Sequence, residues 1–186
     1  MIKRKDRILI SAIELLGEEG VNGITTKNLA LKESVSEAAL YRQYKGKQEI
    51  LNQILEEYAG YDEQIENTIM QTSLKGKKAI IFYVTRYAEN FQNYFEMTTI
   101  MFSMDLYYYN NETKSFMENI IHHRIDFLES IIESNLEEFS LANVFNSKEI
   151  ASLINGIIFS QVYEWRMSNK SYDLVQKLVS VISKIL

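Results

Sequence analysis

The sequence contains no cysteine and no proline, and only seven of its 186 residues are glycine. The absence of cysteine excludes disulfide bonds, thiolate metal sites and cysteine nucleophiles. Because proline stops helices and punctuates loops, its absence and the scarcity of glycine favour long helices joined by short connections. A chain of this length can form one good-sized core, or a small module fused to a larger one. We therefore expect an all-α protein.

Long apolar runs and targeting signals are also missing. No segment approaches the roughly 18 uninterrupted apolar residues of a membrane span. The start, "MIKRKDRILI", lacks the small-residue cleavage site of a signal peptide. We expect a soluble, cytoplasmic protein without membrane contact.

The sequence offers little for catalysis or metal binding. Its only histidines, His122 and His123, are adjacent, so on a helix they point about 100° apart and do not form an i, i+4 metal-binding pair. We interpret each as a polar surface or pocket-edge residue; the alternative is a ligand or a base. No glycine-rich phosphate loop and no nucleophile elbow is present. We expect no metal, no cofactor and no enzymatic activity.

Charge is distributed unevenly along this acidic chain. Residues 1–48 carry nine Lys or Arg against six Asp or Glu, a net charge of +3, whereas the whole chain has a net charge of −5. A basic end on an acidic protein is the asymmetry expected when that end meets a polyanion. The alternative is an ordinary solvated helix surface.

The same 48 residues, which we call the head, read as three helices. In "KRKDRILISAIELLGEEG" (3–20), apolar residues recur at i, i+4, i+7 and i+8, and glycines follow where a helix can end. Thr25 offers a side-chain cap for a second, short helix, and Ser36 offers one for a third, "EAALYRQY" (37–44). Two short helices joined by a three- to four-residue turn and braced by a longer helix form a helix-turn-helix.

The head also resembles a known family. From Arg7 to Leu55 it is similar to the DNA-binding domain of the TetR family of bacterial transcription regulators, where the pattern "ILxAAxxLFxxxGxxxTTxxxIAxxxGVSxGxLYxxFxxKxxLL" recurs. Here the chain reads "ILISAIELLGEEGVNGITTKNLALKESVSEAALYRQYKGKQEIL". It departs from the pattern at Ser34, where the turn glycine is usual, and at Ala38, where glycine is common. Beyond residue 56, only length and helical pattern support the resemblance.

The resemblance implies that the head binds double-stranded DNA. Tyr41 matches a tyrosine whose hydroxyl meets a phosphate, and Lys47 matches a lysine at the start of the fourth helix, where exposed N–H groups also attract anions. The basic N-terminus and the start of the second helix would contact further phosphates. The third helix would contact the bases. The predicted DNA-binding residues are Lys3, Arg4, Thr25, Lys27, Ser36, Glu37, Ala38, Ala39, Tyr41, Arg42 and Lys47.

Glu37 has two interpretations. Its carboxylate can accept a hydrogen bond from a cytosine N4 amino group. Alternatively, the stretch Ser34-Val35-Ser36-Glu37 is a capping box, in which the glutamate turns back to the backbone. Its neighbours Ala38 and Ala39 suit contacts with thymine methyl groups, whereas Leu40 and Tyr44 are expected in the core.

The rest of the chain reads as further helices, about nine in all. A fourth helix, "KQEILNQILEEYAGYDEQIENTIM" (47–70), contains the boundary between a helix-turn-helix DNA-binding domain (1–48) and a helical ligand-binding and dimerisation domain (49–186). Because this helix is a rigid connection, a structural change in the second domain would move the head. Helices are then expected over 77–95, 96–106, 114–139 and 149–169, and from Ser171 onward.

The last two helices are too apolar for ordinary surface helices. One apolar face can serve the subunit core, and a second face would be covered by another copy in a four-helix bundle. The alternative is a single, deeply buried helix pair. The predicted dimerisation residues are Leu153, Gly156, Ile157, Ser160, Leu178, Val181 and Ile182. A two-fold homodimer would also place two heads in successive major grooves of a palindromic operator, about 34 Å apart.

Aromatic residues and methionines concentrate between residues 82 and 109. Flexible methionines and large aromatic walls suit an adaptable apolar pocket, although such residues also fill cores. The predicted ligand-binding residues are Tyr87, Phe91, Tyr94, Met97, Met101, Phe102 and Tyr107. They predict a hydrophobic or aromatic small molecule as the effector.

Together these features predict a homodimeric, sequence-specific transcription regulator, with repression relieved by a hydrophobic small molecule. Three alternatives stay open. The first is a DNA-binding regulator that is gated by a protein partner or acts without a ligand. The second is a helical adaptor that uses the helix-turn-helix to bind protein. The third is a helical enzyme, which would need convergent polar groups in the pocket that the sequence does not show.

Overall fold

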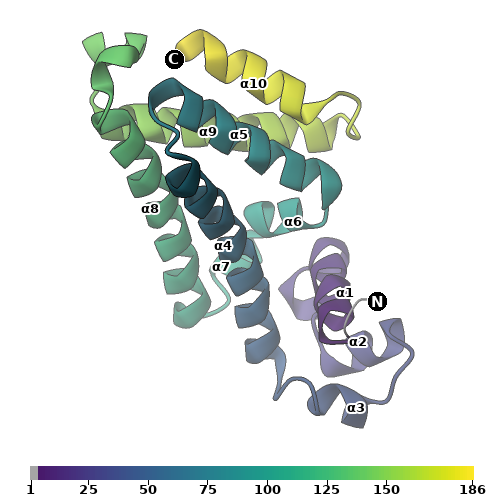
Figure 1. The fold of residues 1–186 in the computed structure, drawn as a ribbon. Helices are drawn as coiled ribbons and strands as arrows, with labels where there is room; N and C mark the ends of the chain where they lie inside the picture. The colour runs from purple at the N-terminus through teal and green to yellow at the C-terminus, as the bar shows by residue number, and fades with distance from the viewer. Residues whose placement is uncertain (1–3) are drawn as a thin grey trace. The chain divides into compact units, whose positions relative to one another are not determined.

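The structure is a computed structural model that describes residues 4–186, and every regular element in this range is helical (Figure 1). The α-helices are α1 (Arg4–Glu19), α2 (Thr26–Lys32), α3 (Glu37–Tyr41), α4 (Lys47–Thr72), α5 (Gly76–Asn93), α6 (Met97–Phe102), α7 (Met104–Tyr107), α8 (Asn111–Glu133), α9 (Ser147–Met167) and α10 (Leu174–Ile185). The 3-10 helices are η1 (Val21–Gly23), η2 (Leu136–Glu138) and η3 (Ser140–Asn143). The predicted all-α class is confirmed.

The chain divides into two compact units. The first unit comprises Met1–Gly60 and Tyr94–Asn119, and the second comprises Tyr61–Asn93 and Ile120–Leu186. The helix-turn-helix therefore shares a unit with α6, α7 and the beginning of α8. The division into functional domains at residues 48 and 49 stays a prediction, because these units group the chain by packing alone.

In the first unit, side-chain caps begin both short helices as the sequence predicts. The Thr25 hydroxyl oxygen accepts a hydrogen bond from the Asn28 N–H at 3.0 Å, and the Ser36 hydroxyl oxygen accepts one from the Ala39 N–H at 3.2 Å. Leu40 and Tyr44 are buried in the core, as expected. The third helix is shorter than predicted, since α3 ends at Tyr41.

The turn between α2 and α3 accommodates serine in place of the usual glycine. Ser34 adopts a left-handed conformation with φ of 53°. The turn is closed by two hydrogen bonds, from Ser34 N–H to the Leu31 carbonyl at 3.1 Å and from Val35 N–H to the Ala30 carbonyl at 2.9 Å. This is the double closure of a Schellman motif. The left-handed conformation costs a residue with a Cβ about 1–2 kcal/mol, and the turn geometry is kept nevertheless.

Two predicted helices of the middle segment need correction. The range 96–106 is not one helix, because Ser103 (φ −85°, ψ 82°) leaves the helical region and separates α6 from α7. The helix predicted over 114–139 starts earlier, at Asn111, because the Asn110 side chain accepts from the Thr113 N–H at 2.9 Å. It also ends earlier, at Glu133, and η2 follows.

In the second unit, α10 packs against α5 and α9. The predicted capping pair of α9 is confirmed: the Asn146 side chain accepts from the Glu149 N–H, and the Glu149 carboxylate accepts from the Asn146 N–H, both at 2.9 Å. The last helix begins at Leu174 rather than at Ser171, because Asp173 provides its cap. Within residues 4–186, no helix combines the length and the apolar content needed to cross a membrane.

Candidate nucleic-acid interface and ligand site

The predicted base-reading residues lie on an accessible part of the first unit. Ser36, Glu37, Ala38 and Arg42 are exposed, and Ala39 is half-buried. They belong to α3 and its two flanking caps. A short connection joins α2 to α3 (Figure 1). The start of α3 is therefore accessible from solvent, as a contact with a DNA groove requires.

Glu37 is held by the neighbouring helix. The Thr26 hydroxyl donates to Glu37 Oε2 at 2.9 Å and lies 3.5 Å from the Tyr41 hydroxyl. The capping-box interpretation of Glu37 is wrong, because Ser36 is the cap and the third residue after it is Ala39. Tyr41 is 54% exposed, so its hydroxyl is accessible to a phosphate.

The predicted phosphate contacts are in different environments. Lys27 is exposed. Thr25 is half-buried, and its hydroxyl accepts the capping hydrogen bond, which leaves its own proton for a phosphate. Lys3 and the side chain of Arg4 lie outside the described residues.

Lys47 opens α4 and is only partly exposed. Its ammonium lies 4.7 Å from the centre of the Tyr109 ring. Burial lowers the pKa of Lys47, and the negative charge of Asp105 opposes this effect. The lysine therefore contacts a residue 62 positions further along the chain.

The predicted ligand-binding residues are divided between the two units. Tyr87 and Phe91 are buried in the second unit, with their rings edge to face and their centres 4.8 Å apart. The other five belong to the first unit. There Met101 is buried, Tyr94 is 62% exposed, and Met97, Phe102 and Tyr107 are half-buried.

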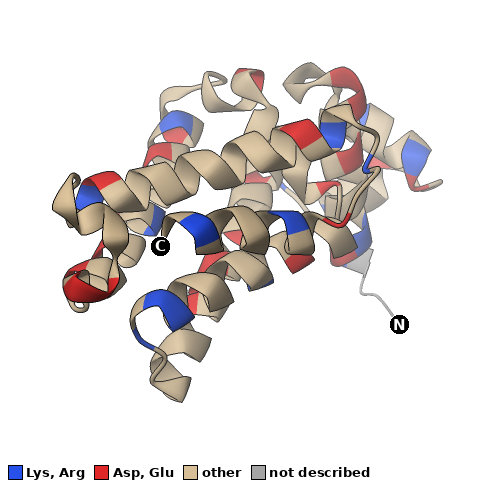
Figure 2. Ribbon diagram, turned by 90° about the horizontal axis from the view of Figure 1, so that it is seen from above, with Lys and Arg blue, Asp and Glu red and all other residues tan. Residues whose placement is uncertain are grey.

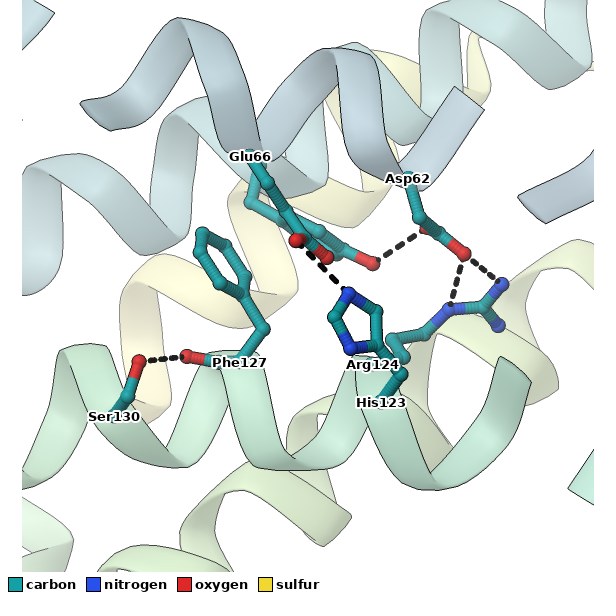
Figure 3. A network of polar contacts seen from close by, with 7 residues as sticks. Asp62, Glu66, His123, Arg124, Phe127 and Ser130 are labelled. Atoms are coloured by element: carbon teal, nitrogen blue, oxygen red, sulfur yellow. Dashed lines mark hydrogen bonds and ion pairs between the residues drawn. The ribbon is translucent and has the colours of Figure 1, made fainter. Parts of the chain in front are cut away.

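The second unit also contains a charged cluster that the sequence did not reveal (Figure 3). Arg124 Nε and Nη2 donate to Asp62 Oδ2 at 3.3 and 2.7 Å, and the Tyr83 hydroxyl donates to Asp62 Oδ1 at 2.9 Å. The Arg124 guanidinium also lies 4.7 Å from the centre of the Tyr87 ring. Burial raises the pKa of Tyr83 well above its usual value, and the charge of Asp62 raises it further.

A second acid lies one turn further along α4. Glu66 Oε2 is 3.0 Å from His123 Nε2, whereas Glu66 Oε1 is buried without a hydrogen-bond partner among residues 4–186 (Figure 3). Burial raises the pKa of the Glu66 carboxyl, and His123 partly offsets this. Among residues 4–186, no group of three or more His, Asp or Glu side chains is arranged to hold a metal ion.

A groove with a volume of about 590 Å³ lies beside this cluster in the second unit. Its lining combines apolar side chains with a polar rim: Ile69, Met70, Ser73, Leu74, Lys75, Phe127, Ser130, Ile131, Ser134 and Asn135. A row of rings leads inward from it. Phe127 lies 6.1 Å from Tyr83, which stacks on Tyr87 at 5.8 Å, and Tyr87 contacts Phe91. The row joins the groove to two of the predicted ligand-binding residues.

The predicted dimerisation residues fall into two groups. Leu153, Gly156, Ile157 and Ser160 line an open apolar groove of about 690 Å³ on α9. Leu178 and Ile182 are 0% exposed, so we correct their assignment: they face the core, because α10 packs its apolar side on α5. Val181 is half-buried. Its helix carries only Lys177 and Lys184 as charged residues, and it is largely tan where it ends at the C-terminus in Figure 2.

Comparison with known proteins identifies the family. The model described as "Bacterial regulatory proteins, tetR family" matches residues 8–54, and the model described as "YsiA-like protein, C-terminal region" matches residues 48–186. The chain belongs to the tetR family of bacterial regulatory proteins. It is a DNA-binding transcriptional regulator, and its C-terminal region is of the YsiA-like type.

One known sequence and two solved structures are similar to this regulator. The fatty acid metabolism regulator protein of Bacillus subtilis (strain 168) is 21% identical over 177 residues, which is 95% of this chain and 90% of that protein. The structure of FadR from Bacillus subtilis in complex with stearoyl-CoA is 20% identical, with a TM-score of 0.79 over 98% of this chain and 97% of the other. The ketosteroid transcriptional regulator KstR2 of Mycobacterium tuberculosis is 13% identical, with a TM-score of 0.82 over 100% and 94%.

Proposed function

We propose that this TetR-family regulator is a homodimeric repressor that leaves a palindromic operator when a hydrophobic small molecule binds its C-terminal region. The proposal that an effector binds is supported mainly by the groove of about 590 Å³ and by the row of aromatic rings that leads from it to Tyr87 and Phe91. Apolar concavities with a few polar groups at the rim are typical of small-molecule sites. An effector acts by binding the DNA-competent and incompetent shapes unequally.

An amphipathic anion with a long acyl chain is the effector class that we place first. Ile69 and Ile131 give the groove an apolar floor. Lys75 stands at its rim, and Lys77 and Lys78 follow it in the sequence. Lysine side chains suit phosphate groups as point charges. The FadR structure contains stearoyl-CoA, which has this combination of an acyl chain and phosphates.

A homodimer is supported by the open apolar groove on α9. An exposed apolar surface of this kind typically marks an interaction site. A second copy would cover it and would also supply the second head that a palindromic operator needs.

The test begins with an operator selected from a pool of random duplexes. Stearoyl-CoA is then titrated against the protein–operator complex, with coenzyme A lacking an acyl chain as the ligand control. We expect stearoyl-CoA to release the operator and to raise the melting temperature of the free protein, and coenzyme A to do neither. Stearoyl-CoA that binds without changing operator affinity would argue for gating by a protein partner or for no ligand control.

A matched pair of variants connects the response to the groove. Met70 lies on the groove wall and is 61% exposed, so Met70→Glu places a charge there with little effect on folding. Val144→Glu places the same charge at another exposed apolar residue of the second unit, outside the groove. We expect Met70→Glu to weaken stearoyl-CoA release and Val144→Glu to leave it unchanged. Equal responses in both variants would place the effector elsewhere.

A further inference from the structure

The connection from α7 into α8 packs directly on the helix-turn-helix within the first unit. We call residues 105–112 the α7–α8 corner. Asp105 Oδ2 accepts the Val21 N–H at 2.5 Å, and Asn110 Nδ2 donates to Gln48 Oε1 at 2.6 Å. These two polar contacts reach η1, which follows α1, and the first turn of α4.

The same corner makes two more contacts with α4. The Lys47 ammonium lies over the ring of Tyr109, 4.7 Å from its centre. Asn52 Nδ2 donates to Glu112 Oε1 at 2.7 Å. The corner therefore holds the beginning of α4 at three positions, Lys47 and Gln48 in the first turn and Asn52 in the next.

The glycine at the end of α1 makes room for this docking. Gly20 has φ of 70°, and a Cβ placed there would lie 2.6 Å from Asp105 Oδ2. Any other residue would be strained in the backbone and would collide with the carboxylate. Gly20 thus allows both the turn after α1 and the close approach of Asp105.

Lys47 is the predicted phosphate contact that the corner touches. A lysine side chain has four rotatable bonds and normally loses much of this freedom when its ammonium is fixed on a partner. A ring beneath the ammonium restricts it beforehand by a cation–π contact. Tyr109 therefore reduces the conformational entropy that the Lys47 side chain loses when it binds DNA.

We infer that Tyr109 is a positioning residue for DNA binding, which holds the Lys47 ammonium where it meets a phosphate, while Asp105, Asn110 and Glu112 fix the helix-turn-helix on the corner. The inference rests on the proposed phosphate contact of Lys47. The corner also includes the end of α7 with the predicted ligand-binding residue Tyr107, and it follows α6, which carries Met101. A shift of that segment would move Tyr109 and loosen Lys47.

The test is a double-mutant cycle on the full-length protein. Tyr109→Leu, Lys47→Ala and the double variant are titrated with the selected operator and with a random duplex at several salt concentrations. Tyr109→Leu is expected to weaken binding to both duplexes alike, by about three- to tenfold, which corresponds to a cation–π contact of ordinary strength. It is expected to have no effect when Lys47 is already alanine.

Two controls separate positioning from folding. Tyr109→Phe keeps the ring and is expected to restore the affinity that Tyr109→Leu loses. Tyr108→Leu changes the exposed neighbouring tyrosine and is expected to leave binding unchanged. Urea unfolding of each variant shows whether stability has changed.

Three results would overturn the inference. Tighter binding by Tyr109→Leu would mean that the ring withholds Lys47 from DNA. An equal loss in the Lys47→Ala background would assign Tyr109 to packing alone, and no rescue by phenylalanine would assign its role to the hydroxyl instead of the ring. A wild-type protein that fails to bind any duplex would instead contradict the proposed function, and the cycle distinguishes the two failures.

Discussion

Arg124 and Asp62 lie 62 residues apart in the sequence and form an ion pair inside the second unit, with Nη2 and Oδ2 separated by 2.7 Å. Their side chains are 4% and 3% exposed. A buried ion pair is tolerated only when its remaining polar atoms are also satisfied. The Tyr83 hydroxyl meets that need at the second oxygen of Asp62, so α4, α5 and α8 are connected through one carboxylate.

Breaking this pair should be costly. Arg124→Met removes the partner and leaves the Asp62 charge buried, so the free energy of unfolding should fall by about 3–5 kcal/mol. Adding Asp62→Asn to Arg124→Met removes the charge as well and should recover part of the loss. Urea denaturation of the three variants and the wild type measures both effects.

An exposed ion pair serves as the control. Arg86 and Glu89 form a salt bridge at 2.6 Å, with side chains 51% and 37% exposed. Arg86→Ala should lower the free energy of unfolding by less than about 1 kcal/mol, because solvent screens such pairs. If Arg86→Ala and Arg124→Met cost the same, burial would not govern the contribution of the Asp62 pair.

Glu66 should make stability depend on pH. Burial raises the pKa of its carboxyl above the usual value of 4.5, so the unfolded chain releases this proton at a lower pH than the folded protein. Between the two pKa values the folded state binds more protons, and the free energy of unfolding therefore falls as pH rises. Below the unfolded pKa both states are protonated and this effect disappears.

Glu66→Gln removes the titration and isolates that contribution. Unfolding free energies of wild type and Glu66→Gln are compared at a series of pH values, starting below 4.5 and rising to neutrality. The wild type should lose stability relative to the variant as pH rises through this window. Parallel curves for the two proteins would show that burial does not shift this carboxyl.

The sequence predicted local structure well because local signals determine it. Thr25, Ser36 and the Asn146–Glu149 pair are caps that act within three residues, and each was confirmed. The helical periodicity of the apolar residues likewise identifies which segments of the chain form helices. The break at Ser103 carries no such signal, since neither glycine nor proline marks it.

Tertiary relationships were harder to predict. Nothing in the sequence pairs Asp62 with Arg124, because a contact across 62 residues depends on how two helices pack. On the apolar α10, periodicity identifies apolar faces but does not say which one meets the core. For that reason Leu178 and Ile182 were assigned to the dimer surface, although they are buried within the subunit.

The accessible residues of α3 should control sequence preference. Glu37→Gln and Ala39→Ser change groups that can face base edges, so they should alter the ranking of operator variants that differ by one base. Tyr41→Phe should weaken binding to all of them alike, because a phosphate contact carries no sequence information. Fluorescence anisotropy against a panel of single-base variants distinguishes the two patterns.

Lys177→Ala is the control for this panel, since it removes a positive charge from exposed surface of the second unit. It should leave both affinity and ranking unchanged. A Glu37→Gln protein that keeps the wild-type ranking would assign Glu37 to its hydrogen bond with Thr26 and exclude it from base reading.

The last prediction concerns assembly. Ile157 is half-buried in the single chain and lines the apolar groove on α9, so a second copy that covers this groove would bury it completely. Ile157→Asp would place an unpaired charge in that contact. Burying this charge would cost much of the free energy of association or prevent association altogether. Sedimentation should show a monomer, and operator affinity should collapse although the helix-turn-helix is unchanged. Met70→Glu, which adds a charge to exposed surface of α4, should remain dimeric. A wild-type monomer at micromolar concentration, or an Ile157→Asp protein that still dimerises, would contradict dimerisation through this surface.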